Sequence, residues 1–316
     1  MTTITLGQNG PTVTPLCIGT WAWGDKLFWN YGNGYDSQQL KEAFTAAIDA
    51  GVTFFDTAEL YGLGMSEEFL GQFMQQKQQQ VQIATKYGPA PWRFTAKSVA
   101  DALTASLKRL QVERVALYQV HWPFAFLMSQ QTLMNALADE VKRGRIASVG
   151  VSNYSVDQMR EAHDILARRG VPLAVNQVRY SLLTRQIESN GIFAAARELG
   201  VTILAYSPLA QGLLTGKYTP DSAETPNGAR KIDPRFSKEG LQKIAPVISL
   251  LRNIGDKYNL TPAQVALNWL IAQGNTIPIA GAKTAQQVRQ NAGALGWQLT
   301  DDEVAQLNEV SRPWLH

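Results

Sequence analysis

Three successive apolar runs of this 316-residue sequence are each followed by side chains that could handle a proton. The runs are Val52–Phe55, Val81–Thr85 and Val115–Val120, and the side chains are those of Asp56, Tyr61, Lys86 and His121. The carboxyl ends of parallel strands meet at one edge of a sheet, so these four groups come together if the runs are neighbouring strands. Each residue alone is most simply a turn, packing or solvated residue, but their joint placement indicates one candidate site.

This set of side chains suits the donation of a proton to a carbonyl oxygen. A phenol titrates near pH ~10 when unperturbed, so Tyr61 alone is a reluctant acid at neutral pH. An ammonium in contact with the phenol, such as that of Lys86, lowers the phenol pKa, and a carboxylate such as Asp56 can hold the ammonium in place. His121 can orient the carbonyl or share the proton.

Other reaction classes are served less well by these residues. The sequence holds three histidines, of which His163 falls inside a predicted helix and His316 is the last residue. A metal needs two or three ligands at the same edge, and Asp56 and His121 are the ones available there. No serine or cysteine stands in a nucleophile turn. We therefore expect neither a hydrolase that uses a serine or cysteine nucleophile nor a metal centre.

Eight short apolar or β-branched runs alternate with longer stretches of helical spacing. The runs are Pro15–Thr20, Val52–Phe55, Val81–Thr85, Val115–Val120, Ile146–Val151, Ala174–Val178, Val201–Tyr206 and Thr276–Ala280. Several are apolar almost throughout, which is typical of strands covered on both faces in a parallel sheet. Eight βα units close into a barrel, whereas six would leave an open sheet. The sequence therefore predicts an α/β fold of the (β/α)8 TIM-barrel class.

Helix start signals and the surplus length complete the predicted architecture. Four segments place a hydroxyl three residues before Glu or Gln, the capping-box pattern: Ser155–Gln158, Thr261–Gln264, Thr284–Gln287 and Thr300–Glu303. A barrel needs about 250 residues, so further elements are expected. These are an N-terminal hairpin within residues 1–13 that closes one barrel mouth and turns at Asn9-Gly10, a long connection at 210–260 with an extra helix Leu241–Tyr258, and a second extra helix, Thr300–Val310. We expect residues 1–316 to form a single domain.

Composition limits the setting and the partners. A hydrophobic content of 45% and a charged content of 17% fit a globular chain rather than a disordered one. A net charge of +3, without a run of five basic residues, argues against nucleic acid as a partner. The single cysteine, Cys17, excludes an internal disulfide, and we find neither a secretory leader nor an apolar run of about 18 residues for a membrane span. The expectation is a cytoplasmic protein with a small-molecule substrate, and the oligomeric state stays open.

Aromatic rings are concentrated in two loops that would line the same rim. The loop at 21–36 holds Trp21, Trp23, Phe28, Trp29, Tyr31 and Tyr35, and the loop after the fourth strand holds Trp122, Phe124 and Phe126. Such rings predict a pocket for an aromatic or apolar carbonyl compound, with Trp23, Trp29 and Trp122 as candidate substrate contacts. The alternative is that the rings roof the barrel and touch no ligand.

An ordered series of motifs resembles the aldo-keto reductase family. The motifs are Gly51-Val-Thr-Phe-Phe-Asp-Thr-Ala-Glu-Leu-Tyr-Gly62, Ala84-Thr-Lys86, Leu117-Tyr-Gln-Val-His-Trp-Pro123, Gly150-Val-Ser-Asn153, Ala205-Tyr-Ser-Pro-Leu209 and Ile277-Pro-Ile-Ala-Gly281. The pattern is closest to a branch that contains reductases of pyridoxal and, more distantly, potassium-channel β subunits. The resemblance implies a barrel that binds NADPH in an extended form and reduces aldehydes or ketones by hydride transfer.

The same resemblance implies a role for each matching position. Tyr61 would be the general acid, Lys86 and Asp56 would tune it, and His121 would position the carbonyl. The positions implied to bind the cofactor are Thr20, Trp21, Ser152, Asn153, Gln177, Tyr206, Ser207, Leu209, Gly281, Lys283, Gln287, Gln290 and Asn291. Among them, Ser152, Asn153 and Gln177 would hold the nicotinamide carboxamide, and Tyr206 would stack on the nicotinamide ring. The chain lacks the G-x-G-x-x-G fingerprint, as this barrel family implies.

The adenosine end of the implied cofactor site departs from the common family pattern. Gln287 stands where many members carry an arginine, and Lys283 and Arg289 are the cations nearby. Lys283, next to the start of the last barrel helix, is the candidate partner of a 2′-phosphate. NADPH is therefore expected, with weaker selectivity over NADH. An alternative function is a nucleotide-sensing regulatory subunit that keeps the cofactor site, although such a sensor would not need Tyr61 or His121.

Overall fold

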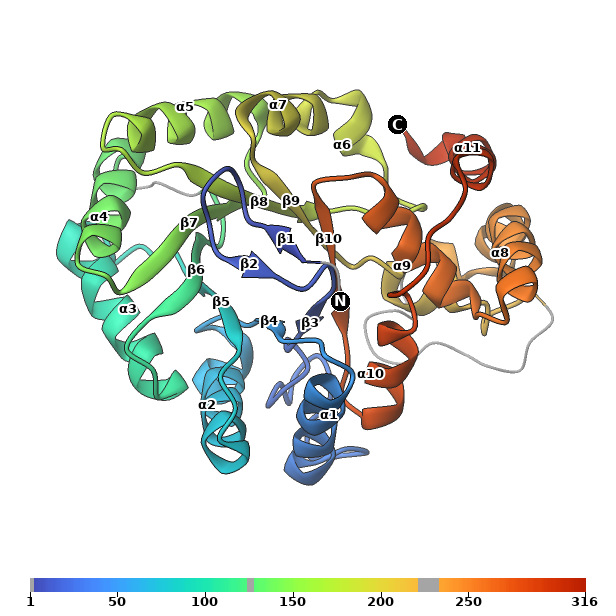
Figure 1. Ribbon diagram of the computed structural model, residues 1–316, viewed down its shortest axis with the longest axis horizontal. Helices are drawn as coiled ribbons and strands as arrows, with labels where there is room; N and C mark the ends of the chain where they lie inside the picture. The colour runs from blue at the N-terminus through green and yellow to red at the C-terminus, as the bar shows by residue number, and fades with distance from the viewer. Residues whose placement is uncertain (1–2, 124–127, 221–232) are drawn as a thin grey trace.

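The computed structural model describes residues 3–123, 128–220 and 233–316, and its centre is a closed barrel of parallel strands (Figure 1). The barrel strands are β3 Cys17–Gly19, β4 Phe54–Asp56, β5 Gln82–Tyr87, β6 Val115–Val120, β7 Ile146–Ser152, β8 Leu173–Arg179, β9 Thr202–Tyr206 and β10 Thr276–Gly281. Each strand pairs with the next along the chain, and β10 pairs with β3 to close the ring. The predicted (β/α)8 class is confirmed, and each predicted run overlaps its strand.

Helices surround the barrel (Figure 1). They are α1 Ser37–Asp49, α2 Met65–Lys77, α3 Ala96–Leu110, α4 Gln130–Lys142, α5 Val156–Ala167, α6 Gln186–Ser189, α7 Ile192–Leu199, α8 Lys238–Tyr258, α9 Pro262–Ala272, α10 Ala285–Ala292 and α11 Asp301–Val310, with the 3₁₀ segments η1 Tyr61–Gly64, η2 Ala210–Thr215, η4 Pro234–Phe236 and η5 Arg312–Trp314. The two expected extra helices are α8 and α11. Helix α8 begins at Lys238 rather than Leu241 because the Ser237 hydroxyl accepts the Gly240 amide at 3.1 Å. No helix in the described ranges is both long and apolar enough to cross a membrane.

Three of the four predicted capping boxes form, at the starts of α5, α9 and α11. The fourth is incomplete at the start of α10. There the Thr284 hydroxyl accepts the Gln287 amide at 3.3 Å, but the Gln287 side chain accepts the backbone N–H of Lys283 at 2.9 Å instead of that of Thr284. The Gln287 side chain therefore braces the loop before α10.

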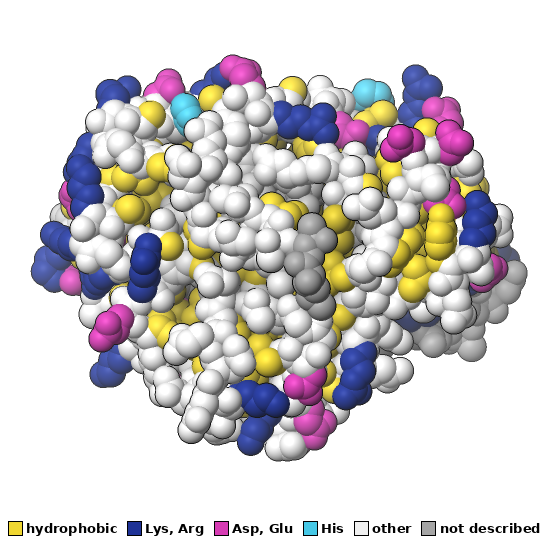
Figure 2. All heavy atoms as spheres, in the orientation of Figure 1, with side chains coloured by type: hydrophobic (Ala, Val, Ile, Leu, Met, Phe, Trp, Pro, Cys, Tyr) yellow, Lys and Arg dark blue, Asp and Glu magenta, His cyan; other side chains and the backbone are white. Residues whose placement is uncertain are grey.

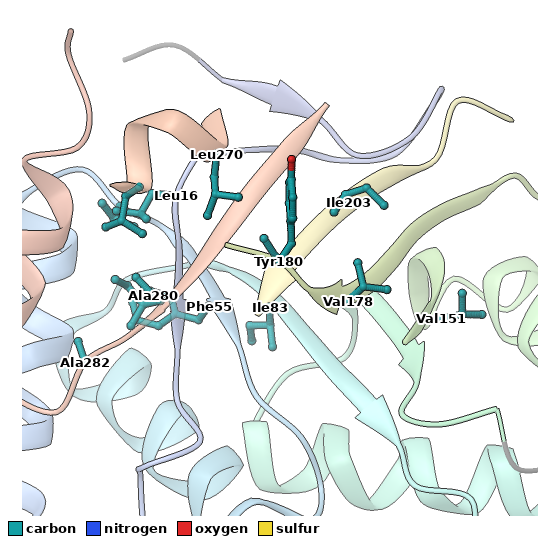
Figure 3. Packing of buried hydrophobic residues seen from close by; sticks show 14 of the residues in the cluster. Leu16, Phe55, Ile83, Val151, Val178, Tyr180, Ile203, Leu270, Ala280 and Ala282 are labelled. Atoms are coloured by element: carbon teal, nitrogen blue, oxygen red, sulfur yellow. The ribbon is translucent and has the colours of Figure 1, made fainter. Parts of the chain in front are cut away.

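Side chains alternate along each strand between the helix layer and the barrel interior, because successive residues of a strand point to opposite faces. Outward residues such as Phe55, Ile83 and Val178 pack in the large hydrophobic core (Figure 3). A separate apolar cluster fills the amino-terminal part of the barrel and combines strand residues with Leu6 and Val13 of the hairpin segment. Its members are Leu6, Val13, Cys17, Phe54, Ala84, Leu117, Ala174, Val175, Leu204, Ile277 and Ile279. Two residues further along β4 and β5, the inward positions hold Asp56 and Lys86. The barrel interior therefore has an apolar floor beneath a polar rim.

The N-terminal hairpin joins β1 Ile4–Thr5 to β2 Thr12–Val13 and lies across one barrel mouth (Figure 1). Leu6 and Val13 are 0% and 2% exposed and belong to the apolar floor. The Gly7 N–H donates to the Thr202 hydroxyl at 2.9 Å, at the amino end of β9. The hairpin therefore closes the amino-terminal mouth and leaves the opposite mouth, where the strands end, for the polar side chains.

The hairpin turn is wider than the two-residue Asn9-Gly10 turn that we expected. The chain turns between Leu6 and Pro11, with the Gly10 N–H donating to the Leu6 carbonyl at 2.9 Å and the Leu6 N–H donating to the Pro11 carbonyl at 3.1 Å. A Cβ on Gly10 would lie 2.2 Å from the Leu6 oxygen, so this close turn requires glycine. The wider turn lets Leu6 enter the barrel.

Figure 2 shows the face of the molecule that is turned to the viewer in Figure 1. Its Lys, Arg, Asp and Glu side chains lie mainly around the edge, where positive and negative charges are interspersed.

Leu6→Ala is expected to lower the free energy of unfolding by about 2–5 kcal/mol, because it leaves a cavity in the apolar floor. Guanidinium unfolding followed by circular dichroism measures the loss. Leu27→Ala is the matched control, since Leu27 is 99% exposed and its truncation should change little. Equal effects of the two substitutions would show that the hairpin does not seal the barrel.

Candidate active site

The four predicted side chains meet at the carboxyl-terminal mouth of the barrel. Asp56 ends β4, Lys86 lies near the end of β5, His121 directly follows β6, and Tyr61 begins η1 in the loop after β4. The Lys86 Nζ lies 2.6 Å from Asp56 Oδ2 and 3.1 Å from the Tyr61 hydroxyl. The ring centroids of Tyr61 and His121 are 5.8 Å apart, with the rings nearly perpendicular at 77°. The structure therefore brings together the four side chains that the sequence places after the ends of neighbouring strands.

The hydrogen bonds of Lys86 determine where the Tyr61 proton can point. Lys86 is fully buried, and its ammonium donates to Asp56 Oδ2, to the Thr57 carbonyl at 2.9 Å and to the Tyr61 hydroxyl. An ammonium has three N–H donors and no acceptor, so all three are used and Tyr61 must accept from it. The phenolic O–H is then left to donate to another oxygen at the mouth.

The protonation states differ from the sequence expectation for Tyr61. Burial raises the pKa of the Tyr61 phenol, and the Lys86 ammonium offsets this only in part. The expected phenol of lowered pKa is therefore wrong, because removing the phenolate from water costs more than the ammonium returns. Burial lowers the pKa of Lys86, but Asp56 and Tyr61 outweigh burial and the net shift is upward. At neutral pH the pair is a neutral phenol beside an ammonium.

His121 is a neutral imidazole in this setting. Burial, with a smaller effect of the Lys86 charge, lowers the pKa of His121 to about 2. Its ring stacks on Trp122, with centroids 3.8 Å apart and planes at 6°, and its backbone N–H donates to the Tyr87 carbonyl at 2.9 Å. Its Nδ1 is buried and has no hydrogen-bond partner among the described residues. A neutral ring of this kind can orient a polar ligand without adding a second charge.

No cluster of three or more His, Cys, Asp or Glu side chains in the described part of the chain could hold a metal ion.

Two glutamine amides hold the second oxygen of Asp56. Gln177 Nε2 donates to Asp56 Oδ1 at 2.8 Å, and Gln119 Nε2 donates to the same atom at 3.2 Å. We did not predict Gln119. The signal was present in β6, where Leu117 faces the apolar floor and Gln119 and His121 follow at two-residue steps on the same face. A search confined to strand ends passes over such a residue.

The loop that carries Tyr61 is anchored by a buried carboxylate that we also did not predict. Glu59 accepts the Gly88 backbone N–H at 2.6 Å and pairs with both terminal nitrogens of Arg93, one of them at 2.9 Å. The Arg93 guanidinium also lies 5.1 Å from the centre of the Tyr87 ring. These contacts tie the loop after β4 to the loop after β5, and so fix the approach of Tyr61 to Lys86.

Four of the predicted cofactor contacts form a connected group at the ends of β7, β8 and β9. The Tyr206 hydroxyl donates to Asn153 Oδ1 at 3.0 Å, Asn153 Nδ2 donates to Ser152 Oγ at 3.0 Å, and Ser152 Oγ donates to the Gln177 carbonyl at 3.0 Å. Burial raises the pKa of the Tyr206 phenol, so this hydroxyl keeps its proton. Gln177 Oε1 accepts no hydrogen bond from any described residue. The group therefore suits a ligand that carries an amide.

The other predicted cofactor contacts lie in the turns after β9 and β10. Ser207 and Leu209 follow β9, and Gly281, Lys283, Gln287, Gln290 and Asn291 extend from the end of β10 into α10. The Ser207 backbone has a φ of 54°, a strained conformation for a residue other than glycine. The Lys283 Nζ lies 4.2 Å from the centre of the Tyr35 ring, and Asn291 Nδ2 donates to the Gly281 carbonyl at 3.4 Å. These residues share one side of the mouth.

Trp23 is a correction to the predicted substrate contacts. It is fully buried, with its ring against Phe55 and Phe73 and its indole N–H donating to the Ala282 carbonyl at 2.8 Å. The chain turns after Thr20 and places this ring in the hydrophobic core between the barrel and the helices rather than at the mouth. Sequence alone did not separate it from its neighbour Trp21.

The side chain of Thr20 is likewise turned away from the mouth. It is fully buried, and its hydroxyl donates to the Asp56 carbonyl at 3.0 Å and shares a 2.7 Å hydrogen bond with Ser66. By contrast, Trp21 is 40% exposed and its ring centre lies 6.3 Å from that of Tyr61. Trp29 and Trp122 are partly buried, while Phe124 and Phe126 lie outside the described residues.

The chain forms a (β/α)8 barrel that holds a buried carboxylate, an ammonium and a phenol at its carboxyl-terminal mouth. The aldo/keto reductase family profile matches residues 15–312, and the chain belongs to this family. It is 41% identical over 318 residues to a chloroplastic pyridoxal reductase of Arabidopsis thaliana, covering 96% of this chain and 85% of the relative. It is 34% identical over 292 residues to an aldo-keto reductase of Schizosaccharomyces pombe named with NADP(+), covering 88% and 84%. The solved structure of a glycerol dehydrogenase from Gluconobacter oxydans superimposes with a TM-score of 0.86 at 29% identity, covering 99% of this chain and 96% of that one.

The neutral state of His121 predicts a pH dependence of stability. The pKa of His121 is about 2 in the folded chain and near 6.5 in an unfolded one, so only the unfolded state takes up a proton between these values. This contribution to stability is complete above pH ~6.5 and is lost as the pH falls. Between pH 7 and pH 5 the wild-type chain should lose about 2 kcal/mol more than His121→Asn, as measured by urea unfolding. His163→Asn is the control, and a wild-type loss no larger than that of His121→Asn would contradict the neutral state.

Proposed function

We propose that this protein reduces aldehydes or ketones to alcohols with NADPH, and that Tyr61 is the general acid. The observation that carries the proposal is the orientation of the Tyr61 hydroxyl. Lys86 occupies its acceptor side at 3.1 Å, so the proton points toward a substrate at the mouth. A phenol whose pKa is raised by burial also keeps that proton until it is needed.

Each member of the cluster has a part in the proposed proton transfer. The neutral imidazole of His121 orients the carbonyl oxygen beside Tyr61. As negative charge develops on that oxygen, Tyr61 gives up its proton, and the phenolate that forms is stabilised by the Lys86 ammonium. Asp56 is a positioning residue, since it holds Lys86 at 2.6 Å and does not itself reach the mouth. The cofactor, when bound, supplies the hydride.

The residues that would hold the cofactor fit a nicotinamide. Ser152, Asn153 and Gln177 offer hydroxyl and amide groups to its carboxamide. The Gln177 side-chain oxygen, which accepts no hydrogen bond from a described residue, supports this assignment. The Tyr206 ring would stack on the nicotinamide, held in place by its hydrogen bond to Asn153. Backbone and polar groups after β9 and β10 would bind the phosphates, with Lys283 facing the 2′-phosphate. The name of the S. pombe relative supports NADP rather than NAD.

An apolar substrate is favoured by the surface of the mouth. The structure has eight exposed large hydrophobic side chains in its described residues, and all except Tyr258 lie in the loops after β3, β4 and β5. They are Trp21, Leu27, Phe28, Leu60, Leu63, Trp92 and Phe94. These loops surround Tyr61, so a bulky aromatic aldehyde would meet apolar surface there. Pyridoxal, which the Arabidopsis relative is named for, is an aromatic aldehyde and should head the panel of test compounds.

Tyr61→Phe should lower the rate of carbonyl reduction by at least about 100-fold, because it removes the proton donor together with one acceptor of the Lys86 ammonium. The affinity for NADPH should stay within about twofold. Loss of reduced-nicotinamide absorbance measures the rate, and tryptophan fluorescence measures cofactor binding. Tyr87→Phe is the matched control, because the Tyr87 hydroxyl is buried and unpaired among the described residues. A Tyr61→Phe protein that still turns over refutes the acid assignment, whereas a wild type that binds NADPH but reduces nothing favours the nucleotide-sensing alternative.

Lys283→Ala should weaken the binding of NADPH by about 1–3 kcal/mol and that of NADH hardly at all, because the 2′-phosphate loses a charge-assisted contact. Fluorescence titration with each dinucleotide measures both affinities. Arg289→Ala, which removes an exposed cation from α10, is the control. Equal losses for NADPH and NADH would place the 2′-phosphate elsewhere.

A further inference from the structure

Three buried side chains beneath the mouth form a closed hydrogen-bonded triangle. Asp56, Gln119 and Gln177 are 2%, 0% and 3% exposed. Gln119 Nε2 and Gln177 Nε2 both donate to Asp56 Oδ1, at 3.2 and 2.8 Å. The Gln177 Nε2 also donates to Gln119 Oε1, at 3.2 Å. The three side chains come from β4, β6 and β8, so the triangle spans the barrel interior.

The direction of every hydrogen bond in this triangle follows from Lys86. An ammonium only donates, so Asp56 must present an oxygen to it, and an ionised carboxylate only accepts. Gln119 and Gln177 must therefore both turn their NH₂ groups toward Asp56. Gln119 then has its oxygen on the other side, where it takes the second N–H of Gln177. Both N–H groups of Gln177 are thus engaged, and its oxygen is the group left over.

We infer that the Lys86–Asp56 pair, acting with Gln119, fixes the polarity of the Gln177 amide, so that this residue offers a bound nicotinamide carboxamide an acceptor oxygen and no donor. This inference rests on the proposed function, because it needs the nicotinamide to lie against Gln177. It gives the ion pair a second task besides supporting Tyr61. Asp56 and Gln119 act here as positioning residues, through Gln177.

Such a fixed polarity selects one end of the carboxamide. The NH₂ end can donate to Gln177 Oε1, whereas a carbonyl presented there would face another acceptor and leave both unpaired. The orientation of the carboxamide would in this way follow from the same ammonium that holds Tyr61. A merely space-filling role for the triangle implies no preference between donor and acceptor groups on the ligand.

The 3-acetylpyridine analogue of NADP⁺ provides the direct test, because a methyl ketone replaces the carboxamide and has no N–H to donate. Its dissociation constant and that of NADP⁺ are measured by tryptophan fluorescence, using the eight tryptophans of the chain. The wild-type protein should bind the analogue at least about tenfold more weakly, since a buried acceptor loses its partner. Comparable affinities in the wild type would overturn the inference and leave the proposed function intact.

Asp56→Asn is expected to reverse the polarity. The introduced amide must turn its oxygen to Lys86, so its NH₂ faces the two glutamines, and Gln177 must then offer its oxygen to that NH₂ and its own NH₂ to the ligand. The ratio of the two dissociation constants should fall to about one or below. Asp49→Asn is the matched control, because Asp49 forms a 3.5 Å surface ion pair with Lys77 and its loss should leave the ratio at the wild-type value.

Gln119→Met provides a second variant that leaves the ion pair intact. It removes one of the two acceptors that hold the Gln177 NH₂ group, so the amide is less firmly fixed and the ratio should fall between the wild-type and Asp56→Asn values. A purely structural role for the triangle would weaken both dinucleotides in parallel. An unchanged ratio in either folded variant overturns the inference. Failure of the wild type to bind NADP⁺ at all would instead refute the proposed function, and the inference with it.

Discussion

The rest of the site depends on one buried ion pair, between Lys86 and Asp56. Taking both charges out of water carries a penalty of several kcal/mol for each, and such a pair is tolerated when hydrogen bonds satisfy its remaining atoms. Here the ammonium has three acceptors and the carboxylate has Lys86 on one oxygen and two amide donors on the other. Removing either partner would leave a buried charge without compensation. Tyr61, Gln119 and Gln177 all take their orientation from this pair.

The barrel makes such a pair possible by its division into layers. Strand pairing places Asp56 beside Ala84 of β5, and two-residue alternation then brings Asp56 and Lys86 to the same interior. The floor beneath them is apolar, and Leu6 and Val13 of the hairpin segment cover it on the amino-terminal side. The carboxyl-terminal loops supply Tyr61 from one side and the group around Tyr206 from the other. Rigid strands thus hold the buried charges, and loops carry the groups that meet a ligand.

The part of this arrangement that could be predicted from sequence was the part that depends on local pattern. Apolar runs located the strands, and their ends located Asp56, Lys86 and His121. The triangle of Asp56, Gln119 and Gln177 could not be predicted, because it depends on the stagger between strands that are not neighbours in the barrel. The sign of the Tyr61 pKa shift depends on burial, which motif spacing does not reveal.

Loop geometry set a similar limit. Trp21 and Trp23 are two residues apart in one aromatic-rich segment, yet one ring is exposed near Tyr61 and the other lies in the core. The direction in which the chain turns after β3 determines which of the two rings is exposed. The amino-acid composition of the segment does not predict that direction. Gln287 shows the same limit, since its side chain braces the Lys283 backbone rather than completing the helix cap.

The reactivity of the lone thiol, Cys17, reports whether the barrel interior is closed. Cys17 sits in the apolar floor, fully enclosed, and burial raises the pKa of the thiol well above its usual value, so very little reactive thiolate exists while the barrel is closed. Alkylating reagents and oxidants would reach that sulfur through opening of the strands around it. The rate at which a thiol reagent labels Cys17 would therefore measure the frequency of local opening of the apolar floor.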